Sequence, residues 1–387
     1  MALINKLNNI ADAIREKTGK SDLLTLEQMP VEIAAIETGG GELPEEAFKI
    51  TGNCQYRFAA NGWNWFIKGY GNKITTENIT DGLNLFRSSN KLEEIPFDLD
   101  FNNSTYRDMS YLFYECAKLT KTGKIINAYP STMQSMFNGC QRLRELPEFV
   151  NPNFSRMQTY AYANMGNMFS YCYSLRRIPE ELLKQLYGVM TSNSYPVFSS
   201  GFNSCYVLDE IRGLNPQTGT ITSDIFGGAF GSCQRLKEII FATQEDGTPY
   251  SVNWKNQTIN LVNPNAYSSA ITPVGVVTGA ETNITTYYNS GITSDKSVVD
   301  DASYQALKND PDWYTKDTAY SRYNHDSAVN TINSLPDTSA YLATAGGTNT
   351  IKFNGAAGSK TDGGAINTLT EEEIAVAAAK GWTVTLV

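Results

Sequence analysis

The sequence has a single histidine, His325, and lacks most of the motifs on which enzyme chemistry relies. One histidine cannot form an H-E-x-x-H zinc site, and neither a G-x-S-x-G elbow nor a G-x-x-x-x-G-K-[ST] phosphate loop occurs. His325 stands in SRYNHDSAV, just before a predicted helix, which favours a loop or capping role over catalysis. We therefore expect no enzyme activity, no cofactor and no metal.

Basic charge and long apolar runs are also scarce. The net charge is −9 and the pI is about 4.9, which argues against a nucleic-acid-binding protein. No apolar run approaches the roughly 18 residues of a membrane span, so we expect no membrane insertion. The start, MALINKLNNIADAIREKTGK, lacks the basic, apolar and small-residue order of a signal peptide, which indicates assembly in a cytoplasm.

Cysteine is infrequent but regularly placed, and no C-x-x-C pair occurs. In the stretch MQSMFNGCQRLREL around Cys140, apolar residues stand three, four and seven positions before the cysteine and three and six after it. The same phrase recurs at intervals of 24 to 33 residues, and one copy has serine in the cysteine slot. The slot residues are Ser89, Cys116, Cys140, Cys172, Cys205 and Cys233. One copy departs at its end, where Thr122 replaces an apolar residue.

This spacing predicts a repeat architecture. Apolar residues at i, i+3, i+4 and i+7 line one face of a short helix, and the following L-x-x-L/I run is typical of a leucine-rich-repeat strand. Because neither piece can bury its apolar side alone, stacked units should form one core. The prediction is an α/β solenoid: a leucine-rich repeat array with a β-rich N-terminal cap, a helix–strand C-terminal cap and a small N-terminal helical module. The cysteines are then expected to be packing residues.

Other roles for the cysteines fit the pattern poorly. Zinc sites use clustered cysteines, whereas here each unit has one. Serine at position 89 would leave a disulfide ladder unpaired. A thiol nucleophile needs a base, and the single histidine is far along the chain.

The chain divides by composition into six parts. Residues 1–37 predict two short helices, the first with an apolar stripe of Leu3, Leu7, Ile10 and Ile14 that could attach the chain to a larger assembly. Residues 38–46 form a linker, 47–80 predict strands of a β-rich cap, and 81–241 hold the repeats. Residues 242–320 are either degenerate repeats or an insertion. Residues 321–387 predict helix–strand units, with a capping box at Thr370 and Glu373 and a helix stop at Gly381.

The candidate binding residues are aromatic. The chain has 22 tyrosines, and aromatic faces stack on sugars or pack on protein. The candidates are Trp63, Trp65, Tyr111, Tyr114, Tyr171, Tyr173 and Tyr206; the alternative for each is packing at the rim of the array. Acid pairs at 98/100, 300/301 and 310/312 could serve a glycosidase, but they are equally typical of turns.

Three stretches resemble known families. The repeated F-x-x-C-x-x-L-x-x-I phrase resembles the BspA-like leucine-rich repeats of bacterial surface proteins over about residues 81–241. LNNIADAIREKTGKSDLLTLEQMPVEIAAI looks like a short N-terminal module of structural proteins of phages that infect Gram-positive bacteria, and the segment from YNHDSAVNTINSLPD to LTEEEIAVAAAKGWTV is similar to C-terminal segments of the same proteins.

The resemblance implies a virion component of the tail tip, baseplate or a fibre. Its partners would be other virion proteins, through residues 1–37, and a host-surface glycan or protein, through the repeat face. We expect a homo-oligomer, with a trimer as the guess. The alternatives are a head or tail decoration or scaffold protein without a receptor role, and a glycan-cleaving tail enzyme.

Overall fold

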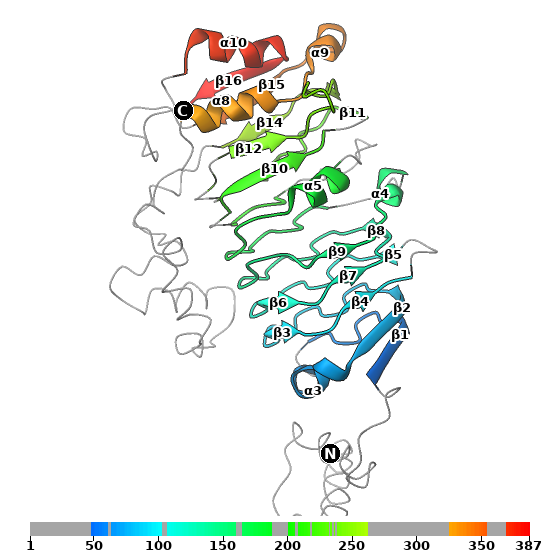
Figure 1. Cartoon of the computed structure of the whole chain (residues 1–387). Coiled ribbons are helices and arrows are strands. Elements are labelled where there is room, and N and C mark those ends of the chain that lie inside the picture. The colour runs from blue at the N-terminus through cyan, green and yellow to red at the C-terminus, as the bar shows by residue number, and fades with distance from the viewer. Residues whose placement is uncertain are drawn as a thin grey trace, which may run out of the picture.

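The computed structural model describes residues 48–60, 63–102, 107–159, 165–187, 200–205, 208–216, 219–231, 233, 236, 238–261, 325–353 and 369–387. Short strands follow one another along the long axis of the molecule, from β1 (Lys49–Asn53) at one end to β16 (Trp382–Leu386) at the other (Figure 1). All pairs between these named strands are parallel, as expected when equivalent strands of successive units lie side by side.

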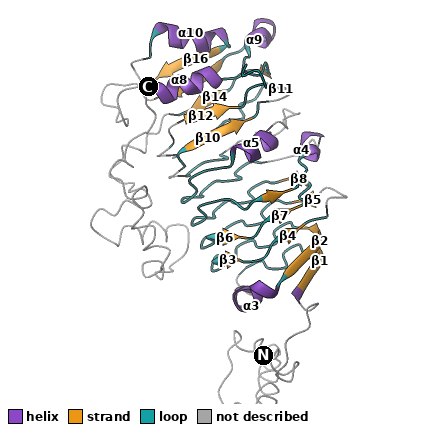
Figure 2. Ribbon diagram, in the orientation of Figure 1, coloured by secondary structure: helices purple, strands orange, loops and turns teal. Residues whose placement is uncertain are grey.

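Each of the first units contributes strands to separate small sheets. One sheet pairs β3 (Glu94–Ile95) with β6 (Lys121–Thr122), a second orders β4 (Leu99–Asp100), β7 (Ile125–Ile126) and β9 (Phe149–Val150), and a third pairs β5 (Arg107–Asp108) with β8 (Pro130–Thr132). Later units pair β10 (Glu210–Leu214) with β12 (Glu238–Phe241), and β11 (Thr220–Ile221) with β13 (Asn253–Trp254). Between these strands the chain consists mostly of loops and turns (Figure 2).

The repeated phrase itself is not helical, so the helical turn predicted for each unit is wrong. Tyr111 and Glu115 have φ of 58°, and alternate N–H groups bond to the next unit: Phe113 N–H donates to Met136 O at 2.9 Å and Glu115 N–H to Asn138 O at 2.7 Å. The N–H groups between them close local turns, such as Cys116 to Phe113 O. Since half of the backbone N–H groups in the turn donate to the next unit, the i to i−4 hydrogen bonds of an α-helix cannot form.

The phenylalanine three residues before each slot forms a continuous stack. Neighbouring ring centroids lie 5.3 to 6.0 Å apart with interplanar angles of 18° or less, a geometry favourable for aromatic pairs. The stack consists of Phe58, Phe86, Phe113, Phe137, Phe169, Phe202 and Phe230. The stack therefore begins at Phe58, one unit before the first copy of the repeated phrase. Phe58 lies inside residues 47–80, which were predicted to form the cap.

The cysteines are buried and free, as predicted, and each of the five slot cysteines also makes a directed contact between units. Cys140 Sγ donates to Phe113 O at 3.1 Å, and this carbonyl also accepts from the N–H of Cys116 in its own unit at 3.0 Å. The same contact recurs from Cys116, Cys172, Cys205 and Cys233 at 3.0 to 3.1 Å. Ser89 Oγ donates to Phe58 O at 2.7 Å, which explains why serine can occupy the slot.

The N-terminal cap is less β-rich than predicted. β1 pairs with β2 (Thr75–Asp81), but α3 (Asn64–Tyr70) and a 3₁₀ turn (Gly71–Lys73) lie between them where strands were expected. In α3, Phe66 and Tyr70 stand four residues apart, which places both rings on one helix face against Phe48 at 6.2 and 5.5 Å. Burial of these rings favours the helix.

The C-terminal elements continue the parallel pairing. β14 (Thr258–Asn260) pairs with β15 (Asn349–Phe353), and β15 pairs with β16. The helices of this part are α8 (His325–Ser334), α9 (Ser339–Ala345) and α10 (Glu371–Ala379). The capping box of Thr370 and Glu373 is present, and Gly381 follows α10 at φ 80°. Two shorter helices, α4 (Ser155–Thr159) and α5 (Glu180–Tyr187), flank the middle units.

Three side-chain contacts fasten α10 to α8. His325 Nε2 lies 3.1 Å from Glu373 at the start of both helices, and Lys380 Nζ donates to Ile332 O at 3.0 Å and Asn333 O at 2.6 Å at their ends. Hydrogen bonds to Asp326 and Glu373 raise the pKa of His325, and the pKa of Glu373 is lowered mainly by the Thr370 N–H, with a smaller contribution from His325.

The slot contact predicts an order of stabilities among variants of Cys140. Cys140→Ala removes both a buried sulfur and a donor and should lower the free energy of unfolding by about 1–3 kcal/mol. Cys140→Ser should cost less, because the hydroxyl keeps the donor, as at position 89. Urea unfolding followed by circular dichroism measures both values. A serine variant no more stable than the alanine variant would contradict the hydrogen-bonding role.

The His325 contact predicts a pH dependence of the C-terminal cap. Because the folded-state pKa of His325 lies above its unfolded value of about 6.5, the stabilisation is complete below that pH and is lost as the pH rises through the folded pKa. The Tm difference between the wild type and His325→Gln should therefore be largest near pH 5.5 and shrink towards pH 8.5. A difference that is constant with pH would show that His325 contributes by packing alone.

Candidate functional site

Side chains of the turns form a surface that we call the turn face, which consists of the residues five, two and one positions before each slot. Several small polar residues at these positions are buried, as at Asn84, Ser135, Ser170 and Ser204, whereas large residues reach the surface to different extents. The positive φ of Tyr111, Glu115 and Tyr171 is fixed by hydrogen bonds between units, so these positions have a defined backbone. The large or charged members are Tyr56, Arg87, Tyr111, Tyr114, Glu115 and Tyr171.

A cation–aromatic cluster lies on the turn face in neighbouring units. The Arg87 guanidinium carbon lies 5.3 Å from the ring centroids of both Tyr111 and Tyr114, and the two rings meet edge to face at 5.4 Å. Arg87 also donates to Asn84 Oδ1 at 3.1 Å, and Ser88 Oγ donates to Glu115 at 3.0 Å. Burial and the neighbouring Glu115 raise the pKa of Tyr114, so its hydroxyl stays protonated and can donate.

Tyr171 and Tyr173 have different environments. Tyr171 is 46% exposed, whereas Tyr173 is 7% exposed and does not point outward as predicted. A binding role for Tyr171 stays a prediction. Tyr173 follows its slot directly, and the residues at this position in two other units, Ala117 and Gln141, are buried as well. The side chain directly after the slot therefore points into the core. The sequence did not show this, because the residue type at this position differs from unit to unit.

The two tryptophan candidates belong to the cap. Trp63 is 43% exposed and packs edge to face on Phe58 and Phe66, at 6.1 and 5.9 Å. Trp65 lies in α3 and not in the predicted strand, and its side chain is outside the description. Tyr206 and the attachment residues Leu3, Leu7, Ile10 and Ile14 lie outside the described residues. Tyr56, 51% exposed, was missed because its unit has no cysteine to mark the register.

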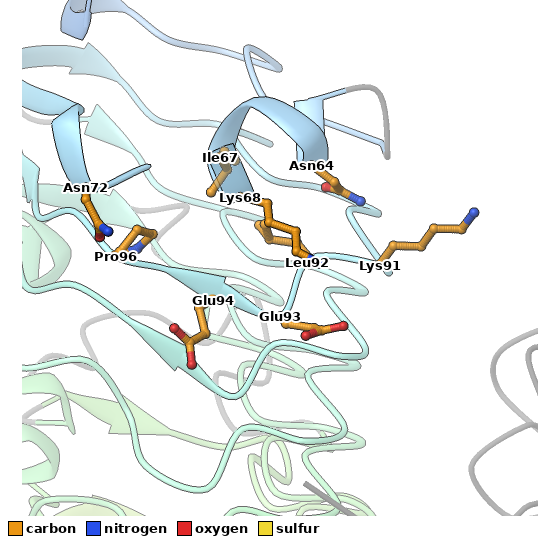
Figure 3. Close-up of a pocket in the computed structure, with 9 residues that line it drawn as sticks. All are labelled: Asn64, Ile67, Lys68, Asn72, Lys91, Leu92, Glu93, Glu94 and Pro96. Atoms are coloured by element: carbon orange, nitrogen blue, oxygen red, sulfur yellow. The ribbon is translucent and has the colours of Figure 1, made fainter. Parts of the chain in front are cut away.

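A pocket of about 450 Å³ lies between α3 and the segment that leads into β3 (Figure 3). Ile67, Leu92 and Pro96 supply its apolar surface, and Lys68 lies over Leu92. Lys91, Glu93 and Glu94 line the opposite side, and Figure 3 shows the carboxylates of Glu93 and Glu94 pointing apart. The remaining lining residues are Asn64 and Asn72. The sequence did not indicate this site, because α3 itself was not predicted.

A second pocket of about 400 Å³ lies on the same side of the strands further along, beside α5. Several of its charges are paired: Arg212 Nε lies 2.8 Å from Glu210, Arg212 also contacts Glu238, and Glu180 lies 2.9 Å from Lys184. Ion pairs of this kind hold neighbouring units and α5 together, which leaves fewer groups for a ligand.

The carboxylates and thiols that could have taken part in catalysis make structural contacts instead. Asp98 Oδ1 accepts from Lys124 N–H at 2.7 Å, and Asp100 Oδ1 accepts from Asn127 at 2.8 Å, so both carboxylates join adjacent units. Burial raises the pKa of the slot cysteines, to about 12 for Cys233, and keeps the thiols protonated. The other two acid pairs, at 300/301 and 310/312, lie outside the described residues.

Within the part of the chain that the structure describes, no group of three or more histidine, cysteine, aspartate or glutamate side chains is placed to hold a metal ion. Nor does this part contain a helix with the length and hydropathy needed to span a bilayer.

Comparison with known proteins gives one match. The family model described as "Mycoplasma protein of unknown function, DUF285" matches residues 58–148 and again 80–182. This repeat-like family is often found in surface proteins of the BspA-like type. The matched region begins at Phe58, the first ring of the phenylalanine stack. No curated protein and no solved structure matches the chain.

Proposed function

We propose that the chain is a non-enzymatic structural protein of a phage virion that binds the host surface through its turn face. Its stacked units form one solenoid, and residues 1–37 attach it to other proteins of the tail tip, baseplate or fibre. The partner on the host is a surface glycan or protein. The assembled form is a homo-oligomer, with three copies as the working number.

The aromatic turn face, in which Tyr56 and Tyr171 are exposed and Tyr111 and Tyr114 are half-buried, supports the binding role most strongly. Tyr56, Arg87, Tyr111, Tyr114 and Tyr171 belong to turns whose backbone is held by bonds between units. Tyrosine and arginine are the residues that most often supply the binding energy of an interface, and a rigid scaffold lowers the entropy lost on binding. The match to a family often found in surface proteins agrees with this role.

The non-enzymatic part of the proposal is supported by the reactive side chains that make structural contacts. The slot thiols donate within the core, Asp98 and Asp100 join units, and His325 fastens α8 to α10. The virion part depends on the sequence likeness of residues 1–37 and of the C-terminal segment to phage structural proteins.

Replacing the turn-face tyrosines should abolish surface binding without unfolding the chain. The other units supply tolerated residues: serine stands at the position of Tyr111 in Ser135, asparagine at that of Tyr114 in Asn138, and serine at that of Tyr171 in Ser204. In the triple variant Tyr111→Ser/Tyr114→Asn/Tyr171→Ser, we expect binding of the labelled full chain to a panel of Gram-positive cells to fall at least about tenfold.

The matched control is Tyr341→Ser on α9, away from the turn face, which should bind as the wild type does. If the wild type binds no cells yet assembles into particles, the decoration alternative holds and the receptor role is refuted. If incubation with wall polysaccharide releases new reducing ends, the chain is an enzyme and the proposal is wrong.

A further inference from the structure

The two ends of the row of parallel strands differ in how the outer strand is protected (Figure 1). At one end, β1 carries Lys49, which pairs with Glu77 at 2.7 Å, and the pairing of β1 with β2 is irregular on both sides of Gly52. Charges and irregularities of this kind keep an outer strand from pairing with another chain. At the other end, β16 (WTVTL) has no charged residue and no proline, and its register with β15 is unbroken. The outer edge of β16 therefore lacks these protections.

Backbone groups of β16 point towards this outer edge. Among the described strands, β16 pairs only with β15. Val387 N–H donates to Phe353 O at 2.9 Å, on the side of β15. Because successive residues of a parallel strand direct their N–H and C=O groups to opposite edges, those of Val384 and Leu386 point away from β15. A further strand could bond to them there.

An aliphatic surface lies beside this edge. In the part of the chain that the structure describes, the exposed large aliphatic side chains are Val376, Leu386 and Val387, whereas the other exposed large hydrophobic side chains are aromatic. Val376 belongs to α10, which packs on β16, and the exposed residues between Ala375 and Ala379 carry no charge. Exposed aliphatic groups next to an unprotected strand edge indicate an interaction surface.

We propose that a second copy of this chain binds this surface, with β16 paired to β16 in antiparallel orientation about a two-fold axis. This inference specifies the contact of the homo-oligomer in the proposed function, and it gives two copies instead of three. With Val384 on the axis, Thr383 lies opposite the partner's Thr385, and Leu386 lies opposite the partner's Trp382. Threonine then pairs with threonine and apolar with apolar residues, without opposed like charges, so the edge is complementary to itself.

The charges of α10 favour the antiparallel arrangement over a parallel one. Its first turn carries Glu371 and Glu372, both exposed, and Lys380 stands at its end. About a two-fold axis, the acidic first turn of one copy lies towards the Lys380 end of the other copy. A parallel arrangement would instead bring the glutamates of both copies together, and juxtaposed like charges oppose association.

Multi-angle light scattering of the full chain after gel filtration measures the number of copies. At chain concentrations up to roughly 100 μM, we expect a mass of twice the 42.7 kDa of one chain. A mass that stays at one chain, or that rises to three, would overturn the proposal.

Variants locate the contact. Val376→Lys/Leu386→Lys places charges on the aliphatic surface and should weaken pairing at least about tenfold, so that the mass falls to one chain. The matched control, Thr75→Lys/Thr220→Lys, adds the same charge at exposed positions of β2 and β11 and should stay paired. A double variant of Val376 and Leu386 that stays paired would refute the contact.

A second measurement leaves β16 itself unaltered and serves if the double variant fails to fold. In Val376→Lys, hydrogen exchange of the peptide 382–387 should be faster than in the wild type at the same concentration, because the N–H groups of Val384 and Leu386 lose their partner strand. Equal exchange would refute the proposal. Both experiments use purified chain and no cells, so the contact between copies can fail while the tyrosine-dependent cell binding succeeds, and the reverse.

Discussion

The backbone carbonyls of the stacked phenylalanines are the contacts on which the repeat region depends. In five of the stacked residues, this oxygen accepts one hydrogen bond from the N–H of its own slot residue and a second from the thiol of the following unit: Phe86, Phe113, Phe137, Phe169 and Phe202. Both lone pairs of a buried oxygen are thereby satisfied, which avoids the cost of an unpaired polar group in the core. The contact also fixes the distance between units, so that the phenylalanine rings stack and the backbone N–H groups of the turns reach the next unit.

This arrangement explains features of the turns that would otherwise be unfavourable. Residues such as Tyr111, Glu115 and Tyr171 have positive φ, which costs a non-glycine residue roughly 1–2 kcal/mol. The hydrogen bonds to neighbouring units hold them in this conformation. The same turn that buries the cysteine and the phenylalanine leaves Tyr171 and Glu115 exposed and Tyr111 half-exposed. Core packing and the proposed binding surface therefore depend on the same turns.

The parts of the fold that could be predicted are those with local signals. Burial of the cysteines, the strand after four of the six slots, and the capping box at Thr370 and Glu373 all follow from spacing within a few residues. The strands predicted after Cys140 and Cys172 are not formed. The turn conformation was not predictable, because the i, i+3, i+4 and i+7 spacing is shared with a helix and the bonds that decide against a helix come from the next unit. Phe58 and Tyr56 were missed because their unit lacks the cysteine that sets the register. The pocket beside α3 joins segments with no motif in either, so only the packed structure could reveal it.

The slot thiols are buried hydrogen-bond donors between units, and the proposed binding surface depends on the turns that they hold in place. The direct measurement is the rate at which the native full chain reacts with a thiol reagent such as 5,5′-dithiobis(2-nitrobenzoic acid), compared with the chain in denaturant. The account predicts that the thiols react slowly in the native state and that all six react on unfolding. Rapid reaction of several thiols in the native state, or fewer than six reactive thiols in denaturant without reductant, would contradict it.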